Sequence, residues 1–230
     1  MKLKRALLVV IGVVATLFPG VSTASADDTY QPYIVDGYYA GHTNGAVQQF
    51  RNGQAWCTAS LISAYWVLTA QHCVTASASY GYRVGSTDAY AGTWANASAI
   101  YQHPSADLAL VRLSNPVSGP IVRLGSTSPG QYAQIYGWGS TCASDGCPSR
   151  WLKYANTIVS STNARDGRGG VAIALSRYDG ITAGGDSGGP AFANGTNIQV
   201  GVASTSDRAN YASYTSVAYY RGWIRSVSGV

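Results

Sequence analysis

Three short stretches of the chain contain residue types that can act together in nucleophilic catalysis. Residues 68–73 read Leu-Thr-Ala-Gln-His-Cys, residues 106–110 read Ala-Asp-Leu-Ala-Leu, and residues 184–190 read Gly-Gly-Asp-Ser-Gly-Gly-Pro. A serine hydroxyl is a weak nucleophile near neutral pH and needs a neighbouring base. An imidazole, with an ordinary pKa of about 6.5, can be that base, and a carboxylate can orient it and stabilise its cation. The chain order is one of those known for such triads, so we predict a catalytic triad of His72, Asp107 and Ser187.

The composition indicates which elements position these residues. Charged residues make up 11% of the chain, well below the roughly 25% of ordinary globular domains. Gly, Ser, Thr, Ala, Val and Tyr dominate, a mixture poor in strong helix formers and rich in strand and turn residues. Short apolar segments separated by Gly, Asn, Ser or Pro recur between residues 46 and 217. This pattern favours an all-β barrel or sandwich, with a single closing helix at residues 219–227.

The motifs together resemble the trypsin-like serine peptidase family over almost the whole chain after its N-terminal segment. Residues 56–73, which begin Trp-Cys and end His-Cys, resemble the family's block around the catalytic histidine. Residues 136–139 resemble its Gly-Trp-Gly strand, and residues 200–204 resemble the strand that lines its substrate cleft. The resemblance implies a chymotrypsin-like fold of two six-stranded antiparallel β-barrels with a C-terminal helix and an active site between the barrels.

The same resemblance implies an activity and its catalytic groups. A member of the family is a serine endopeptidase that cleaves proteins or peptides through an acyl-enzyme intermediate. The backbone N–H groups of Gly185 and Ser187 would form the oxyanion hole, and losing one such donor typically lowers the rate by about 10²–10³. No cofactor is expected.

The N-terminus predicts export from the cell. Lys2, Lys4 and Arg5 precede an apolar run over residues 6–18, followed by the small residues Ala-Ser-Ala at positions 24–26. This is the pattern of a signal peptide over residues 1–26, and the apolar run is too short to span a bilayer comfortably. An uncleaved membrane anchor is the alternative. We therefore expect a secreted protein that has no membrane attachment once the signal peptide is removed.

A second processing step is predicted at the Tyr33–Ile34 bond. Residues 34–37 read Ile-Val-Asp-Gly and resemble the terminus that activating cleavage frees in the family, although Asp36 replaces a usual glycine. The resemblance implies a propeptide over residues 27–33, a catalytic domain over residues 34–230, and an ion pair between the new Ile34 ammonium and Asp186. The alternative is that residues 27–33 are merely a flexible start.

The four cysteines allow three disulfide pairings. Cys142 and Cys147 bracket a short turn and are natural partners, which leaves Cys57 to pair with Cys73. A metal site is the alternative, but the spacing and the oxidising compartment both argue against it. We predict two disulfides and no metal.

Specificity is predicted from four positions of the primary pocket. In the family the residue six before the nucleophile lies at the pocket base, and here it is Ile181. An aliphatic floor cannot compensate a buried cation, so we expect no cleavage after Arg or Lys and an apolar residue at P1, the residue whose carbonyl is attacked. Ser204 would line the cleft, and Ser206 and Ala212 would narrow the pocket.

Two other classes of function are also consistent with the sequence. A binding protein on the same fold is one, since fold does not determine function, and an esterase with the same triad is the other. The arginines are scattered along the sequence and form no stripe for nucleic acid. We expect a monomer whose partners are protein or peptide substrates and protein inhibitors.

Overall fold

The computed structural model describes residues 34–142 and 147–230. The predicted signal peptide and propeptide lie outside these residues. The first barrel is closed and comprises six antiparallel strands in the order β2, β3, β4, β7, β6 and β5. Their bounds are Ala46–Arg51 (β2), Gln54–Ser63 (β3), Trp66–Thr69 (β4), Tyr80–Val84 (β5), Thr93–Gln102 (β6) and Ala109–Leu113 (β7).

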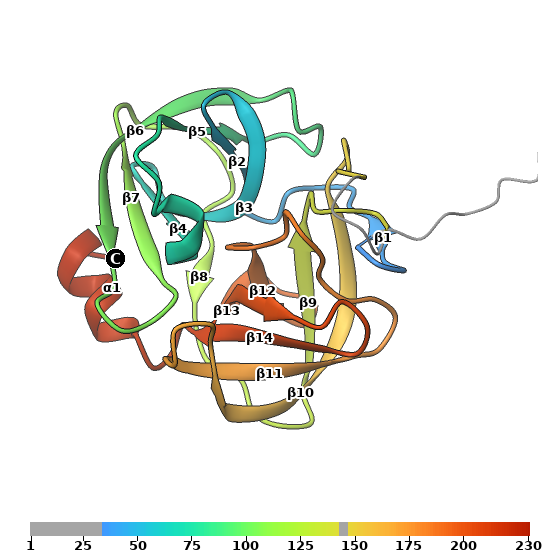
Figure 1. Ribbon diagram of the computed structural model, residues 1–230. Coiled ribbons are helices and arrows are strands. Elements are labelled where there is room, and N and C mark those ends of the chain that lie inside the picture. The colour runs from blue at the N-terminus through green and yellow to red at the C-terminus, as the bar shows by residue number, and fades with distance from the viewer. Residues whose placement is uncertain (1–33, 143–146) are drawn as a thin grey trace, which may run out of the picture. The chain divides into compact units, whose positions relative to one another are not determined.

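The second barrel also contains six strands, and pairings of β9 with both β10 and β12 close its ring. The strands are β9 (Tyr132–Gly137), β10 (Lys153–Arg165), β11 (Val171–Arg177), β12 (Pro190–Ala193), β13 (Ile198–Ser206) and β14 (Tyr211–Ser216). In Figure 1 the first barrel, coloured blue to green, lies above the second, coloured yellow to red. The predicted all-β, chymotrypsin-like architecture is confirmed.

Two short strands lie outside the rings. β1 (Tyr38–Tyr39) pairs with β10, and β8 (Arg123–Leu124) pairs with β13. The β8–β13 pair is parallel, unlike the pairs that form the two rings. Helix α1 (Arg221–Ser228) follows the second barrel and confirms the predicted helix.

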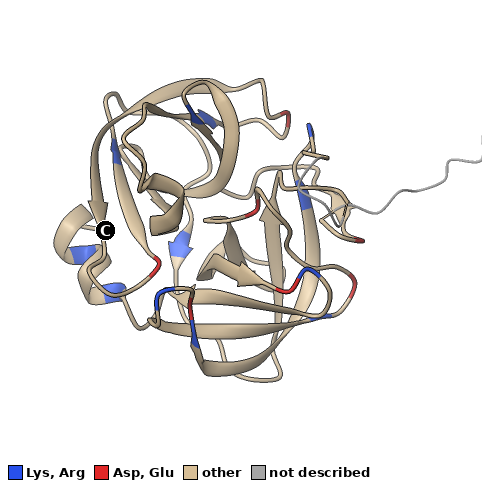
Figure 2. Cartoon of the chain, viewed as in Figure 1, with Lys and Arg blue, Asp and Glu red and all other residues tan. Residues whose placement is uncertain are grey.

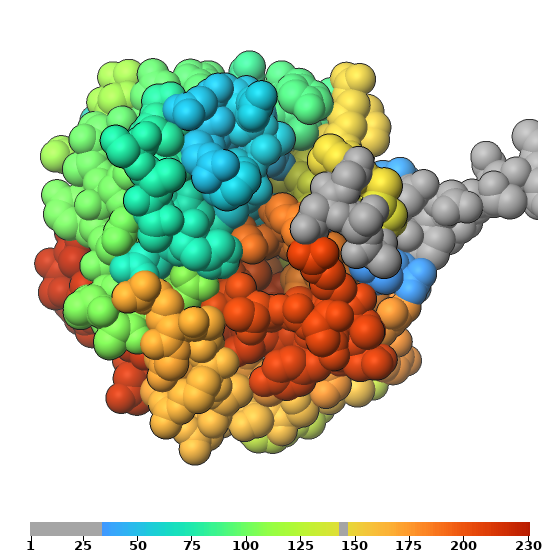
Figure 3. All heavy atoms as spheres, in the orientation of Figure 1, coloured from blue at the N-terminus to red at the C-terminus, as the bar shows by residue number. Residues whose placement is uncertain are grey.

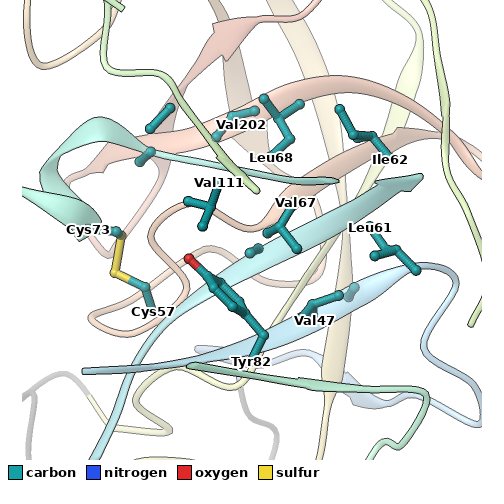
Figure 4. Close-up of a cluster of buried hydrophobic side chains, with 14 of the residues drawn as sticks. Val47, Cys57, Leu61, Ile62, Val67, Leu68, Cys73, Tyr82, Val111 and Val202 are labelled. Atoms are coloured by element: carbon teal, nitrogen blue, oxygen red, sulfur yellow. A yellow bond between two sulfur atoms is a disulfide. The ribbon is translucent and has the colours of Figure 1, made fainter. Parts of the chain in front are cut away.

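Successive residues of a strand point to opposite faces of its sheet, so burial alternates along a strand that has only one face in the core. Along the first half of β10, every second residue from Lys153 to Val159 is buried. In the first barrel, Val47, Leu61, Val67 and Val111 point into a common core (Figure 4). The Cys57–Cys73 disulfide lies beside this core and ties β3 to the segment that carries His72.

The few charged residues are spread over both barrels, as Figure 2 shows. Among the described residues, no helix is both long enough and apolar enough to cross a membrane.

Candidate active site

His72 lies in the short 3-10 helix η1 (Gln71–Val74), directly after β4. Its backbone N–H donates to Asp107 Oδ1 at 3.0 Å, and its ring Nδ1 lies 2.7 Å from Asp107 Oδ2. The imidazole is 42% exposed, whereas the carboxylate is 3% exposed. The buried carboxylate therefore fixes the orientation of a ring whose opposite edge faces the cleft.

Asp107 receives further hydrogen bonds from the second barrel. The Ser204 hydroxyl donates to Asp107 Oδ2 at 2.6 Å. Burial alone would raise the pKa of Asp107, but the hydrogen bonds from His72 and Ser204 outweigh it and hold that pKa below its ordinary value. Asp107 is thus kept ionised at neutral pH.

A second buried carboxylate, Asp166, lies behind Asp107 and was not predicted. Its Oδ2 accepts the backbone N–H of Asp107 at 2.9 Å. The hydroxyl of Thr215 lies 3.0 Å from the same oxygen and 3.1 Å from the carbonyl oxygen of Asp107. Asp166 occurs in an Arg-Asp-Gly turn between β10 and β11, far from the triad in sequence, so no local motif could have revealed it.

Ser187 lies in the connection between β11 and β12, and glycines shape its loop. Gly185 has φ +96° and Gly188 has φ +78°, a region that favours glycine. The carbonyl of Ser187 accepts the N–H of Thr58 at 2.9 Å, and the carbonyl of Gly185 accepts the Thr58 hydroxyl at 3.0 Å. Thr58 of the first barrel thereby holds the Ser187 loop of the second.

His72 and Ser187 line one pocket of about 370 Å³. The atoms of the two barrels adjoin on the face shown in Figure 3, the first blue to green and the second orange to red. Within the described part of the chain, the N–H groups of Gly185 and Ser187 donate to no protein acceptor. Both predicted oxyanion donors thus remain available to a ligand.

Asp186, next to Ser187, is fully buried. Its carboxylate accepts the N–H of Gly139 at 2.7 Å and that of Ala183 at 2.9 Å. Burial raises the pKa of Asp186 to about 6, although these bonds and the charge of Lys153 oppose the rise. A Cβ at Gly137 or Gly139 would collide with this carboxylate, which explains both glycines of the Gly-Trp-Gly motif.

Ile34, the other member of the predicted activation pair, is 1% exposed. It is joined to Tyr33 in this chain and so carries no α-ammonium, and the pairing with Asp186 stays a prediction. Its neighbour Val35 accepts the N–H of Ile181 at 3.1 Å. Asp36 has φ +69° and forms an ion pair with Arg177. This left-handed backbone explains why glycine suits position 36.

Both predicted disulfides form, Cys57–Cys73 and Cys142–Cys147. Because each sulfur is bonded to another sulfur, none of these cysteines supplies a thiolate to a metal. The alternative of a cysteine metal site therefore does not hold.

A second pocket of about 250 Å³, here called the primary pocket, opens beside Ser187. It is lined by Thr182, Ala183, Gly184, Ser187, Ala203, Ser204, Thr205, Ser206 and Arg208. Of the four predicted pocket residues, Ser204 and Ser206 line it. Ile181 and Ala212 are fully buried and are not part of the lining. Arg208 was not predicted, and the lining is richer in hydroxyl groups than an apolar pocket would be.

The sequence model of the family described as Trypsin matches residues 21–224. The chain belongs to the trypsin family. As a trypsin-family member it is a serine endopeptidase, a hydrolase. An uncharacterized peptidase of Corynebacterium glutamicum is 29% identical over 235 residues, which cover 98% of this chain and 82% of that protein. Trypsin-3 of Salmo salar is 28% identical over 233 residues, which cover 90% of this chain and 97% of that protein.

Solved structures with the same fold include two of low sequence identity to this trypsin-family chain. The HL collagenase structure has a TM-score of 0.72 at 24% identity and covers 85% of this chain and 99% of that chain. The structure of human heparin binding protein has a TM-score of 0.70 at 21% identity and covers 85% of this chain and 96% of that chain. At this identity the likeness supports the fold alone.

Proposed function

We propose that this trypsin-family chain is a secreted endopeptidase whose catalytic triad is His72, Asp107 and Ser187. The observation that carries the proposal is the 2.7 Å contact between His72 Nδ1 and Asp107 Oδ2, in a pocket that Ser187 also lines. A histidine whose Nδ1 is held in this way directs its other nitrogen toward a nucleophile.

The reaction follows from these groups. His72 removes the Ser187 proton as Oγ attacks the scissile carbonyl, and Asp107 stabilises the imidazolium that forms. The N–H groups of Gly185 and Ser187 stabilise the oxyanion of the tetrahedral intermediate. His72 then protonates the leaving amine, and water hydrolyses the acyl-enzyme by the same route.

The N-terminal segment supports secretion and maturation. We propose that residues 1–26 are a signal peptide, that residues 27–33 are a propeptide, and that cleavage frees Ile34 to pair with Asp186. Two disulfides fit an oxidising compartment. Membership of the family implies protein substrates. We also propose that the enzyme is a monomer and that protein inhibitors bind it.

The primary pocket supports the exclusion of basic residues at P1. Its described lining offers no carboxylate, so the charge of an Arg or Lys side chain there would meet no compensating acidic group among the described residues. The expectation of an apolar P1 residue rested on Ile181, which is not part of the lining. We therefore do not extend the apolar preference to this pocket.

Replacement of the nucleophile tests the function. Ser187→Ala should lower kcat/KM on peptide substrates by about 10⁴-fold or more, whereas Ser226→Ala in α1 should match the wild type. Thermal unfolding would verify that both variants fold. Parallel peptide and ester panels separate the alternatives, because turnover of esters alone indicates an esterase and an inert wild type indicates a binding protein.

A further inference from the structure

Asp166 begins the turn between β10 and β11 and is 6% exposed. Its Oδ1 accepts the backbone N–H groups of Arg168 at 2.9 Å and Gly170 at 2.8 Å. Its Oδ2 accepts the N–H of Asp107 at 2.9 Å and lies 3.0 Å from the hydroxyl oxygen of Thr215. Among the residues that the structure describes, no Lys or Arg side chain forms an ion pair with this carboxylate. Its partners are therefore main-chain N–H groups and one hydroxyl.

These contacts hold the main chain of Asp107 on both sides of its Cα atom. The N–H donates to Asp166 Oδ2, and the Thr215 hydroxyl oxygen lies 3.1 Å from the Asp107 carbonyl oxygen. An aspartate side chain is short, so its carboxylate follows any shift of the main chain. Such a shift would change the 2.7 Å contact between Asp107 Oδ2 and His72 Nδ1.

A second route links Asp166 to the carboxylate of Asp107. The N–H of Asp166 donates to the carbonyl of Gly170 at 2.9 Å and closes the turn. Gly167 lies inside this turn, and its N–H donates to Ser204 Oγ at 2.9 Å. The Ser204 hydroxyl in turn donates to Asp107 Oδ2 at 2.6 Å. Loss of the Asp166 carboxylate would therefore loosen both the main-chain and the side-chain contacts of Asp107.

The surroundings of Asp166 are closely packed. A Cβ at Gly170 would lie 2.5 Å from Asp166 Oδ2, 2.7 Å from the Cβ of Ala106 and 2.8 Å from the hydroxyl of Tyr220. The ring of Tyr220 packs on that of His103, with 4.6 Å between their centroids. An N–H that loses its acceptor in such a place has no ready replacement, and leaving it unpaired is costly.

Asp166 is separate from the surfaces that a substrate would contact. It lines neither the primary pocket nor the pockets of about 370 and 390 Å³ that His72 lines. Gly167 and Arg168, the next residues of the turn, do line the last of these. Any effect of Asp166 on the reaction must therefore pass through its neighbours.

We propose that Asp166, together with Thr215, is a positioning residue of this peptidase and holds Asp107 against His72. The imidazolium that forms when His72 takes the Ser187 proton is stabilised by a carboxylate at hydrogen-bond distance. Asp166 keeps that carboxylate in place and touches neither the substrate nor the reacting atoms. This inference rests on the proposed triad and adds a second carboxylate that supports it.

Asp166→Asn tests the role on the purified active enzyme. One carboxylate oxygen becomes an amide nitrogen that cannot accept, so either the Asp107 N–H or the N–H groups of the turn lose their acceptor. We expect kcat and kcat/KM on a peptide substrate to fall together by about 10- to 100-fold, as for a small misplacement of a catalytic group. Asp88→Asn is the control. Asp88 accepts the N–H of Tyr90 at 3.1 Å and lines none of these pockets, so the control should keep the wild-type kcat.

A matched pair at Thr215 separates positioning from stability. Thr215→Val removes the hydroxyl and should lower kcat by about 10-fold, the range of one hydrogen bond to a charged group. Thr215→Ser keeps the hydroxyl and should retain kcat, although it loses a buried methyl group and should unfold at a lower temperature. The pair also decides the matter if Asp166→Asn does not fold, because equal kcat values for Val and Ser would overturn the proposal.

A double substitution shows whether Asp166 acts through Asp107. In an Asp107→Ala background there is no carboxylate left to position, so adding Asp166→Asn should change kcat/KM on 4-nitrophenyl acetate very little. Titration of Ser187 with a fluorophosphonate would give the concentration of active enzyme in each variant. A reduction of the same size in both backgrounds would show that Asp166 acts on general stability, and the proposal would be wrong.

The outcomes also separate this inference from the proposed function. If the fluorophosphonate labels Ser187 and folded Asp166→Asn has the wild-type kcat, positioning by Asp166 is wrong and the triad stands. If Asp107→Ala itself has the wild-type kcat, or Ser187 is not labelled in the active enzyme, the proposed triad is wrong.

Discussion

At the residue scale, the site depends on side chains that form hydrogen bonds to more than one partner. Asp107 Oδ2 lies 2.7 Å from His72 Nδ1 and accepts the Ser204 hydroxyl at 2.6 Å. Ser204 Oγ in turn accepts the N–H of Gly167. One serine of β13 thus connects the Asp107 carboxylate to the loop that carries Arg168. The charge on Asp107 is stabilised by groups from both barrels.

Removal of the Ser204 hydroxyl should change the acid stability of the protein. The pKa of folded Asp107 is below its ordinary value of 3.8. The stability from this carboxylate is therefore complete above about pH 4 and is lost as the pH falls through the folded pKa. In Ser204→Ala that pKa rises toward 3.8, and the free energy of unfolding at pH 7 should fall by about 1.5 kcal/mol.

Urea unfolding at several pH values measures this effect. The difference between Ser204→Ala and the wild type should shrink below pH 3 to the pH-independent part that comes from the lost bond between the Gly167 N–H and Ser204 Oγ. Ser160→Ala serves as the control, because the Ser160 hydroxyl donates to a backbone carbonyl and its loss should not depend on pH. An equal difference at pH 2 and pH 7 for Ser204→Ala would rule out the hydrogen bond as its cause.

At the element scale, connections between strands carry the functional groups. His72 follows β4, Asp107 precedes β7, and Ser187 precedes β12. Arg168 and Arg208 lie in the β10–β11 and β13–β14 loops. The strands hold the ends of these loops, and residues with positive φ turn three of them, at Gly169, at Gly185 and Gly188, and at Arg208.

The turn after Ser187 offers a test of this view. A Cβ at Gly188 would collide with the Thr69 side chain and the Thr58 carbonyl, at a φ of +78°. Gly195 has a similar φ of +68° and open space around it. Gly195→Ala should therefore lower the free energy of unfolding only by the cost of a left-handed alanine, of order 1 kcal/mol.

Gly188→Ala should lower the free energy of unfolding clearly more than Gly195→Ala does, because backbone atoms must also move. Thermal unfolding would show the difference, at about 2–4 °C for each kcal/mol in a protein of this size. Equal melting temperatures for the two variants would contradict the close packing of the nucleophile loop on the first barrel.

At the scale of the whole molecule, the two barrels must be correctly placed for the proposed triad to form. The first barrel supplies His72 and Asp107, and the second supplies Ser187 and Ser204. Thr58 fastens the Ser187 loop to the first barrel through two hydrogen bonds. The buried Asp186 belongs to this loop, between Gly185 and Ser187, so a new charge partner for Asp186 can affect Ser187 and the N–H groups of Gly185 and Ser187 together.

Maturation at the Tyr33–Ile34 bond should be carried out by another peptidase. Ser206, which we predict to narrow the primary pocket, is part of its lining, and a narrowed pocket does not favour Tyr33. We therefore expect Ser187→Ala, expressed in the native host, to be secreted with Ile34 as its first residue. N-terminal sequencing or mass spectrometry of the secreted protein would show it. Unprocessed Ser187→Ala beside a processed wild type would indicate self-activation, and an active wild type beginning at Asp27 would contradict the proposed cleavage.

The sequence by itself determined the family, the all-β fold with its closing helix, the two disulfides and the residues proposed as the triad. These depend on local residue types in a set order, and the motif around Ser187 is specific. The Gly-Trp-Gly motif at residues 137–139 was also recognised from the sequence. The reason for its two glycines, the nearby carboxylate of Asp186, is visible only in the fold.

Only the tertiary structure decided which side chains surround the triad. Asp166 reaches the N–H of Asp107 across 59 positions of sequence, and no spacing rule predicts such a contact. Arg208 lines the primary pocket because its loop turns through a left-handed residue. The pocket is lined by Thr182, whereas Ile181 was expected there, because Ile181 packs inward beside Val35. Side-chain directions in loops depend on backbone angles and on packing against the other barrel, which a linear pattern does not record.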